Sequence, residues 1–200
     1  MNKLNIAIAL TASLLLAACK DSPSPAADPK AAAAKPAASA ISIPAIEAEA
    51  RGITVGSPMS ARTVFVFFDP QCPHCAALWN AAKPLKSQAK FVWIPVRLLN
   101  NTSQTQGAAL LAATDPVAAM DAHEASILVD KKGGITPSGD IEAQKEIITK
   151  NTALFTRFGF GSVPSVVGTH AKTGAVVSRE GSMPTADLAA LLGLQVPTAN

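Results

Sequence analysis

The chain has 200 residues, of which 48% are hydrophobic and 16% are charged, so it can form one domain with an apolar core. Three cysteines are too few for a disulfide-rich scaffold, and this hydrophobic content excludes a wholly disordered chain. A net charge of +3 is too small to indicate nucleic-acid binding, and we expect no nucleic-acid partner.

Residues 1–18 are predicted to be a secretory signal peptide. Lys3 precedes the apolar run Leu4–Leu16, and small residues follow up to Cys19. The run is shorter than a membrane-spanning helix requires. Because residues 16–19 read Leu-Ala-Ala-Cys, the signal resembles that of bacterial lipoproteins, in which the cysteine is lipidated. We therefore expect a lipid anchor on Cys19; a soluble periplasmic protein cut at a nearby site is the alternative.

Residues 19–40 are predicted to be a disordered tether. They consist almost wholly of Ala, Pro, Ser, Lys and Asp, a composition that cannot bury enough apolar surface to fold. Such a tether would hold a folded domain away from a membrane surface. Lys20 directly follows the lipidated cysteine, and a lysine at this position resembles the sorting signal of outer-membrane lipoproteins in enteric bacteria. We therefore expect a periplasmic protein that is anchored to the outer rather than the inner membrane.

The remaining sequence predicts an α/β domain. After a lead-in segment over 41–63, changes of periodicity and Gly and Pro breaks divide the chain into elements. The order is strand, helix, strand, a helical block, a hairpin of two strands, and a closing helix. The predicted ranges are 62–68, 72–89, 90–99, 105–160, 163–168 with 175–179, and 185–192. Pro95 predicts that the second strand lies at an edge or carries a bulge.

Cys72 and Cys75 form a Cys-Pro-His-Cys motif where the first strand turns into the first helix. With Cys19 lipidated they are the two thiols left in an oxidising compartment, so they can pair with each other or with another protein. A sulfur at a helix start faces free N–H groups and the positive end of the helix dipole, which lowers a thiol pKa from about 8.5 to roughly 3.5–7.5. Cys72 is therefore the candidate nucleophile, and Cys75 is the candidate resolving thiol.

Pro73 and His74, between the two cysteines, are predicted to set the redox poise. Pro73 stiffens the turn, and the His74 imidazole can add positive charge or a hydrogen bond beside Cys72. Groups that stabilise the thiolate make the disulfide a stronger oxidant. We therefore expect a disulfide donor whose redox centre is the Cys72–Cys75 disulfide and which needs no other cofactor.

Other uses of the cysteine pair have less support in the sequence. A zinc site needs two more ligands, and His123 and His170 are isolated residues typical of surface or core positions, so we predict no metal. Attachment of c-type haem requires a histidine directly after the second cysteine, where this chain has Ala76. A purely structural disulfide would close too short a loop to stabilise much.

Val163-Pro164 is predicted to form a cis-proline loop. Pro164 falls at the start of a predicted strand, where a cis-proline fits better than an ordinary proline. A trans-proline that merely opens the strand is the alternative.

The element order resembles the thioredoxin fold, with a helical insertion at about 104–150 between the second strand and the cis-proline half. Within that superfamily the chain is similar to the periplasmic disulfide-bond (Dsb) proteins, most closely to the catalytic domain of the DsbG and DsbC branch. The resemblance covers about 64–192 of a catalytic domain predicted over 64–194. Besides Cys-Pro-x-Cys, the shared pattern comprises Asp69-Pro70, Trp79, Pro84, Asp115-Pro116 and Val163-Pro164. The resemblance implies exchange with cysteine-containing exported proteins, a membrane redox partner of the Dsb type, and a Val163-Pro164 loop that binds substrate beside the pair.

The chain also departs from that branch. His74 stands where DsbG-type proteins usually have tyrosine, and Val163 stands where the branch usually has threonine. Both residues are DsbA choices, so the site resembles an oxidase site on an isomerase-branch scaffold. Residues 41–63 are too few for the dimerisation domain of DsbC and DsbG, so we expect a monomer.

The leading prediction is a lipid-anchored periplasmic thiol–disulfide oxidoreductase that donates disulfides. A disulfide isomerase or a sulfenic-acid reductase of the DsbG and DsbC type is the alternative from the same chemistry. From a different class, the chain could be a non-catalytic lipoprotein that uses the fold as a binding or metal-chaperone module.

Overall fold

The structure is a computed structural model that describes residues 38–130 and 133–196. The predicted signal peptide, Cys19 and the predicted tether up to residue 37 lie outside the described residues. In the last part of the predicted tether, the Ser39 N–H donates a hydrogen bond to the Arg157 carbonyl at 2.8 Å. Contacts with the folded domain therefore begin before residue 41.

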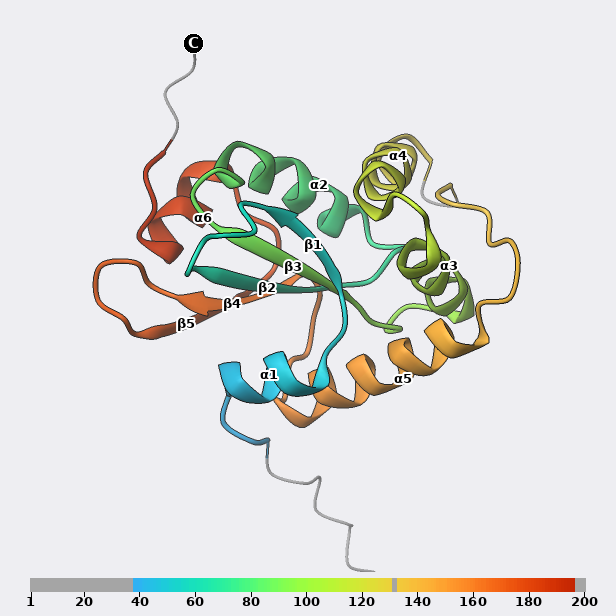
Figure 1. The fold of residues 1–200 in the computed structure, drawn as a ribbon, viewed down its shortest axis with the longest axis horizontal. Helices are drawn as coiled ribbons and strands as arrows, with labels where there is room; N and C mark the ends of the chain where they lie inside the picture. Colours follow the sequence, from blue (N-terminus) through green and yellow to red (C-terminus); the bar gives the residue numbers. More distant parts are fainter. Residues whose placement is uncertain (1–37, 131–132, 197–200) are drawn as a thin grey trace, which may run out of the picture. The chain divides into compact units, whose positions relative to one another are not determined.

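A mixed five-stranded sheet lies between two layers of helices (Figure 1). The strand order in the sheet is β1-β3-β2-β4-β5. β2 and β3 are parallel, and each of the other neighbouring pairs is antiparallel. The strands are β1 (Ile53–Gly56), β2 (Thr63–Phe68), β3 (Lys90–Pro95), β4 (Ser165–Thr169) and β5 (Val176–Glu180).

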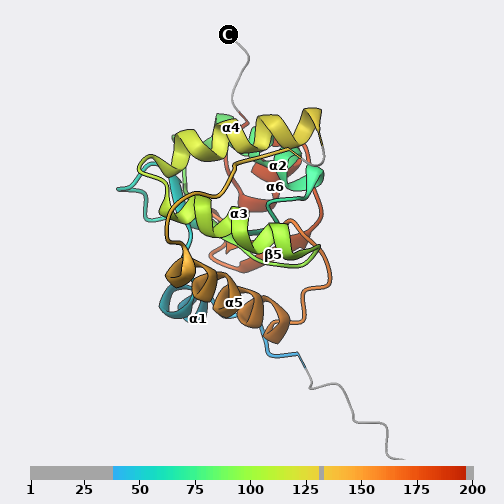
Figure 2. The ribbon, with the colours of Figure 1, turned by 90° about the vertical axis from the view of Figure 1, so that its right-hand side faces the viewer.

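The helices are divided between the two faces of the sheet and one of its ends. α2 and α6 lie on one face, whereas α1 and α5 lie on the other (Figures 1 and 2). α3 and α4 lie beside the start of α2, near the end of the sheet where β2 leads into that helix (Figure 1). The helices are α1 (Ile43–Glu49), α2 (Pro73–Ala82) followed by the 3₁₀ turn η1 (Lys83–Leu85), α3 (Asn101–Ala112), α4 (Pro116–Val129), α5 (Glu142–Arg157) and α6 (Thr185–Leu192).

This arrangement confirms the predicted fold class, an α/β fold of the thioredoxin order with a helical insertion. α3, α4 and α5 fall in the block predicted to be helical over 105–160, except that α3 begins earlier, at Asn101, and α6 has the predicted bounds. Gly159 has a φ of 78°, a conformation that glycine adopts without steric cost, and α5 ends just before it.

The prediction for the second strand was wrong in two respects. β3 lies between β1 and β2, so it is not an edge strand, and it ends at Pro95 rather than continuing to residue 99. Pro95 is paired with Phe68 of β2, whereas the pairing with β1 extends only as far as Trp93 opposite Ile53. The proline is tolerated inside the sheet because β1 does not extend to its level.

Two further elements differ from the sequence prediction. α2 stops at Ala82, before the predicted end at residue 89, and Pro84 lies in η1, because proline cannot continue an α-helical hydrogen-bond ladder. The lead-in segment predicted over 41–63 contains α1 and β1. Because β1 pairs with β3, this segment contributes a strand to the central sheet.

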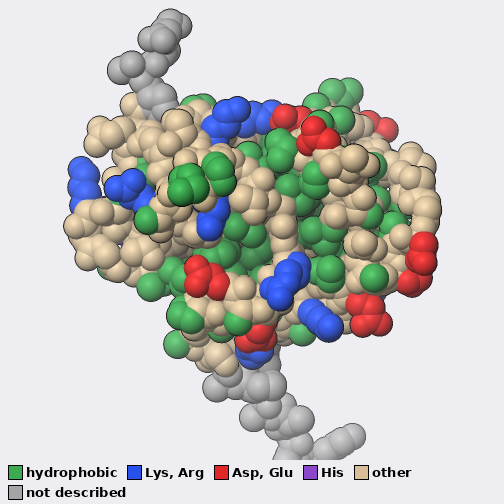
Figure 3. Space-filling model, in the orientation of Figure 1, with side chains coloured by type: hydrophobic (Ala, Val, Ile, Leu, Met, Phe, Trp, Pro, Cys, Tyr) green, Lys and Arg blue, Asp and Glu red, His purple; other side chains and the backbone are tan. Residues whose placement is uncertain are grey.

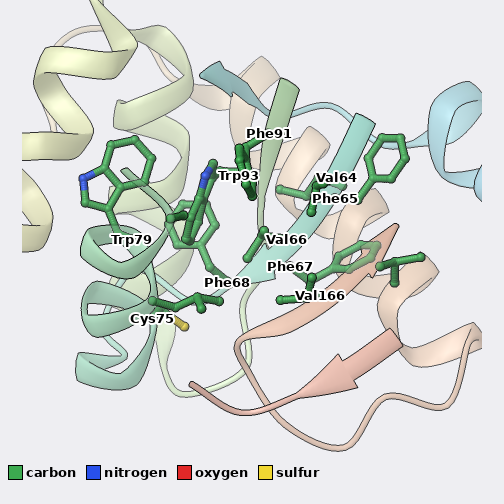
Figure 4. Close-up of a cluster of buried hydrophobic side chains, with 14 of the residues drawn as sticks. Val64, Phe65, Val66, Phe67, Phe68, Cys75, Trp79, Phe91, Trp93 and Val166 are labelled. Carbon is green, nitrogen blue, oxygen red and sulfur yellow. The ribbon is translucent and has the colours of Figure 1, made fainter. Parts of the chain in front are cut away.

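Two aromatic clusters hold the helices to the faces of β2 and β3. On the α2 face, the ring of Trp93 lies 5.7 Å from that of Phe68 and 5.0 Å from that of Trp79 (Figure 4). On the opposite face, the rings of Phe67 and Phe155 lie 5.8 Å apart. Because both faces are covered, β2 is a continuous apolar run rather than an alternating one.

Charged side chains of both signs are spread over the face drawn in Figure 3. Among the described residues, Lys83 pairs with Asp121 and Arg157 pairs with Glu49, each at 2.6 Å. Across the part of the chain that the structure describes, the helices lack the combined length and apolar character needed to cross a membrane.

Asn151 of α5 connects that helix to two strand ends, and its loss is expected to destabilise the fold. Its side chain is buried; it accepts the Arg51 N–H at 3.1 Å and donates to the carbonyls of Arg51 and Pro95 at 2.8 and 3.0 Å. Asn151→Ala leaves these groups without partners, so the free energy of unfolding of the reduced protein in urea should fall by about 3 kcal/mol. The matched change at the exposed Asn80 of α2 should leave it nearly unchanged; equal losses would contradict the assignment.

Candidate active site

Cys72 and Cys75 lie at the N-terminal end of α2. Cys72 is the residue that caps the helix, with an extended backbone, and Cys75 lies in the first turn. Their exposed fractions are 5% and 0%. Figure 4 shows Cys75 on the side of α2 that faces the sheet, close to Phe68. Cys72 is thus the more accessible of two largely buried thiols.

The turn between β2 and α2 is fixed by the carboxylate of Asp69. Its side chain is completely buried, and Oδ1 accepts the N–H of Gln71 at 2.8 Å. Oδ2 accepts the N–H groups of Leu98 and Leu99 at 2.8 and 2.9 Å. The Asp69 carbonyl also accepts the N–H of Cys72 at 2.9 Å. No local sequence pattern indicated that the Asp69 carboxylate ties this turn to the loop after β3.

The start of α2 stabilises the thiolate of Cys72. The hydrogen bond from the Cys75 thiol lowers the pKa of Cys72 to about 6, helped by the N–H groups of Cys75 and His74 and by the charge of His74, while burial opposes the change. The His74 side chain is exposed beside the pair. The structure therefore places His74 where the sequence analysis expected it to act on Cys72.

Cys75 titrates in the opposite direction. Burial raises the pKa of Cys75 well above its ordinary value, and the neighbouring sulfur of Cys72 and the carboxyl of Glu124 add to the effect. In the reduced pair, negative charge therefore resides on Cys72 and the proton resides on Cys75. One sulfur is ready to act as a nucleophile or leaving group, and the other is a shielded thiol.

The Val163-Pro164 peptide bond is cis, as predicted, and it lies against the cysteine pair. In its thiol form, Cys72 donates to the Val163 carbonyl with an S···O distance of 3.8 Å. The loop is held by Glu180 of β5, whose Oε2 accepts the N–H groups of Gly161 and Ser162 and the Ser162 hydroxyl at 2.7–3.1 Å. This role of Glu180 could not be predicted from local sequence patterns, because the contact depends on how β5 pairs with β4.

The insertion helices α3 and α4 also contribute to this site. His123 of α4 is buried; its Nε2 donates to the Pro70 carbonyl at 2.7 Å, and its Nδ1 accepts the Ile135 N–H at 2.9 Å. Burial lowers the pKa of His123, so the ring is neutral. Gln106 of α3 accepts a hydrogen bond from the Gln71 side chain and donates to the Gly133 carbonyl. The insertion thus supports the turn that precedes Cys72.

The histidines left open by the sequence analysis have different surroundings. His123 is a satisfied core histidine, whereas His170 follows β4 and accepts the N–H groups of Lys172 and Thr173 through Nδ1. Over residues 38–130 and 133–196, no three His, Cys, Asp or Glu side chains are grouped as metal ligands.

Glu124, next to His123 on α4, is a site residue that the sequence analysis missed. Its side chain is fully buried, and neither carboxyl oxygen has a hydrogen-bond partner among the described residues. A signal was present in the sequence: Met120, Glu124 and Ile127 share one face of the helix, and the other two are buried apolar residues. An acid on such a face indicates a buried carboxyl.

A family model of the thioredoxin-like domain matches residues 57–195. The chain belongs to this thioredoxin-like family. The matched range contains the cysteine pair, the insertion and the cis-proline loop.

Two curated relatives place this thioredoxin-like chain near DsbG. The thiol:disulfide interchange protein DsbG of Pseudomonas aeruginosa is 29% identical over 144 residues, which cover 70% of the chain and 55% of the relative. DsbG of Escherichia coli is 28% identical over 109 residues, covering 52% of the chain and 42% of the relative. The chain therefore spans about half the length of the curated relatives it matches. These matches confirm the resemblance to the Dsb proteins.

Solved structures confirm the thioredoxin fold. A linker-deletion variant of Proteus mirabilis ScsC superposes with a TM-score of 0.60 at 16% identity, covering 74% of this chain and 76% of that one. A periplasmic thioredoxin-like protein from Salmonella enterica serovar Typhimurium gives a TM-score of 0.58 at 16% identity, covering 71% and 88%. At such low identity the likeness shows the fold alone.

Removing either neighbour of Cys72 should weaken its acidity. His74→Ala should raise the pKa of Cys72 above about 6, because the positive charge is lost, and Cys75→Ala should raise it further, because the largest stabilising hydrogen bond is lost. The pKa can be measured from the pH dependence of Cys72 alkylation by iodoacetamide. His170→Ala serves as the control and should leave the midpoint unchanged. A wild-type midpoint near that of a free thiol would contradict the stabilisation.

Proposed function

We propose that the chain is a periplasmic thiol–disulfide oxidoreductase that donates disulfides to cysteines of exported proteins through Cys72 and Cys75. The observation that carries this proposal is the opposed acidity of the pair: the pKa of Cys72 is lowered to about 6, whereas that of Cys75 is raised well above its usual value. Membership of the thioredoxin-like family and the DsbG relatives support the same chemistry.

The reaction starts from the Cys72–Cys75 disulfide. A substrate thiolate attacks the Cys72 sulfur, the bond to Cys75 breaks, and a mixed disulfide between substrate and Cys72 forms. A second substrate thiolate then attacks the substrate sulfur of that mixed disulfide and expels Cys72 as a thiolate. Two electrons pass from the substrate to the pair. The low pKa of Cys72 makes it a good leaving group in the last step.

The cis-proline loop is the proposed binding site for the substrate chain. The Val163 carbonyl lies 3.8 Å from the Cys72 sulfur, so a substrate segment next to the attacking thiolate would pass along this loop. Glu180 holds the residues before Val163 by three hydrogen bonds, which keeps the loop backbone in place. Backbone contacts of this kind accept many sequences, as a donor to many exported proteins requires.

An isomerase or sulfenic-acid reductase is the second candidate, favoured by the likeness to two DsbG proteins. In that case the reduced pair is the working form, and the Cys72 thiolate attacks a wrong disulfide or a sulfenic acid on the substrate. The geometry of the pair serves both directions, because each step of disulfide exchange is reversible. The direction depends on the redox state in which a membrane partner of the Dsb type keeps the pair.

The reduction potential and the cellular redox state separate the two candidates. For a donor, stabilisation of the Cys72 thiolate should raise the potential above about −180 mV, and trapping of free thiols in cells should find the pair oxidised. A Cys75→Ser variant should accumulate mixed disulfides with exported proteins. A potential near the value of about −270 mV for thioredoxin would contradict disulfide donation; a pair that is reduced in cells would favour the isomerase or reductase.

The proposed location is the periplasmic side of the outer membrane, through a lipid on Cys19. The support is the sequence Leu-Ala-Ala-Cys at 16–19, the lysine that follows it and the Ala- and Pro-rich composition up to residue 40. A domain tethered in this way would meet exported proteins at the membrane without leaving the compartment in which disulfides form.

Removal of the lipidated cysteine should release the protein. Cys19→Ser should move the protein from the membrane fraction to the soluble periplasmic fraction and abolish incorporation of labelled fatty acid, because the thioether to the lipid cannot form. The control is Cys72→Ser, which should remain in the membrane fraction. Wild-type protein that is soluble and unlabelled would contradict the anchor and leave the disulfide chemistry unaffected.

A further inference from the structure

Glu124 is a buried acid for which the fold itself gives no use. It is fully buried on α4, and neither of its carboxyl oxygens has a hydrogen-bond partner among the residues that the structure describes. A carboxyl group in such a place costs stability, because burial removes its hydration and no protein donor replaces the lost water. A group kept at this cost next to a reactive site is a candidate for a chemical role.

α4 holds Glu124 close to the cysteine pair. The preceding residue, His123, is hydrogen-bonded to the carbonyl of Pro70, which is two residues before Cys72. On the neighbouring turn of α4, Asp121 accepts the indole N–H of Trp79 of α2 at 2.8 Å. The helix is thus anchored at two residues close to Glu124, one bound to the turn before α2 and the other to α2 itself.

Of the titratable groups near the pair, Glu124 is the one that can carry a proton to the buried sulfur of Cys75. Asp69 uses both carboxylate oxygens to accept backbone N–H groups, and His123 uses both ring nitrogens in hydrogen bonds. His74 is exposed on the outer side of the pair and acts on Cys72. Among these groups in the described part of the chain, Glu124 has oxygens that no other group occupies.

The charges at the site keep a proton on Glu124. Burial raises its pKa well above the usual value for a carboxyl, and the negative charges of Cys72 and Asp69 add to the shift. Glu124 in turn raises the pKa of Cys75. Glu124 is therefore held in its protonated form more strongly than an ordinary carboxyl, and a protonated carboxyl beside the pair can give its proton to a sulfur on which negative charge develops.

We propose that Glu124 gives a proton to the Cys75 sulfur when the disulfide opens and takes it back when the disulfide closes. On opening, a substrate thiolate forms a bond to the Cys72 sulfur, the electron pair of the broken S–S bond moves to Cys75, and the Glu124 proton neutralises that sulfur. On closing, the Glu124 carboxylate removes the Cys75 proton, Cys75 attacks Cys72, and the substrate leaves as a thiolate. The inference rests on disulfide exchange by this pair, in either direction.

The test is the pH dependence of disulfide opening in Glu124→Gln. The amide has the shape of the carboxyl but cannot donate a proton at this step. The rate at which dithiothreitol reduces the Cys72–Cys75 disulfide is measured over a range of pH and divided by the concentration of dithiothreitol thiolate. In wild-type protein this corrected rate should fall as pH rises through the pKa of Glu124. In Glu124→Gln it should be at least about tenfold lower at the acidic end and independent of pH.

Glu146→Gln is the matched control, because it makes the same carboxyl-to-amide change at an exposed position on α5. Its corrected rate and pH profile should equal those of wild-type protein. Thermal unfolding of each variant accompanies the kinetics. Glu124→Gln should unfold at no lower temperature than wild-type protein, since the carboxyl makes no hydrogen bond within the described residues. Glu124→Met, an apolar side chain of similar length, should show the same kinetic loss and higher stability.

Two outcomes would overturn the role of Glu124. One is a Glu124→Gln variant with the wild-type rate and pH profile. The other is a rate that falls together with the unfolding temperature while the shape of the pH profile is kept, since that identifies a structural role. If the wild-type pair itself does not exchange disulfides, the proposed function fails. An active wild-type pair with an unaltered Glu124→Gln profile refutes only this inference.

Discussion

The stabilisation of a thiolate at the first turn of α2 is the interaction on which the rest of the site depends. The donors to the Cys72 sulfur are the Cys75 thiol and the N–H groups of Cys75 and His74, and they converge on it only because the helix begins directly after Cys72. That starting point is set by the preceding turn, in which the buried carboxylate of Asp69 holds three backbone N–H groups. The acidity of Cys72 is therefore a consequence of how the chain leaves β2.

The helical insertion belongs to this site as much as the thioredoxin-like core does. His123 of α4 and Gln106 of α3 contact the two residues before Cys72, Pro70 through its carbonyl and Gln71 through its side chain. Polar side chains buried in this way restrict the turn. A movement of the turn would break their hydrogen bonds in a place where water does not replace them. An insertion that keeps this turn rigid also brings an acid, Glu124, to the inner side of the pair.

The parts of this molecule that could be predicted from the sequence are those set by local patterns. The Cys-Pro-His-Cys motif after an apolar run, the proline of the later loop and the helices of the insertion all follow from spacing, turn residues and periodicity. β1 was missed because four residues are too few to establish a periodic pattern, and they become a strand only by pairing with β3. Glu124 and Glu180 were missed because their roles depend on contacts between distant elements.

Glu124 limits how much negative charge the pair holds at each stage of exchange. With the disulfide closed, neither sulfur is charged, and Glu124 keeps its proton. When the disulfide opens, the proton passes to Cys75, and the single charge lies on the Glu124 carboxylate while Cys72 is tied to substrate. Release of the Cys72 thiolate beside that carboxylate would place two charges in a buried site, which is costly, so Glu124 regains a proton as Cys72 leaves. Release of the Cys72 thiolate thus depends on a neutral Glu124, because an ionised carboxylate would oppose the thiolate that α2 stabilises.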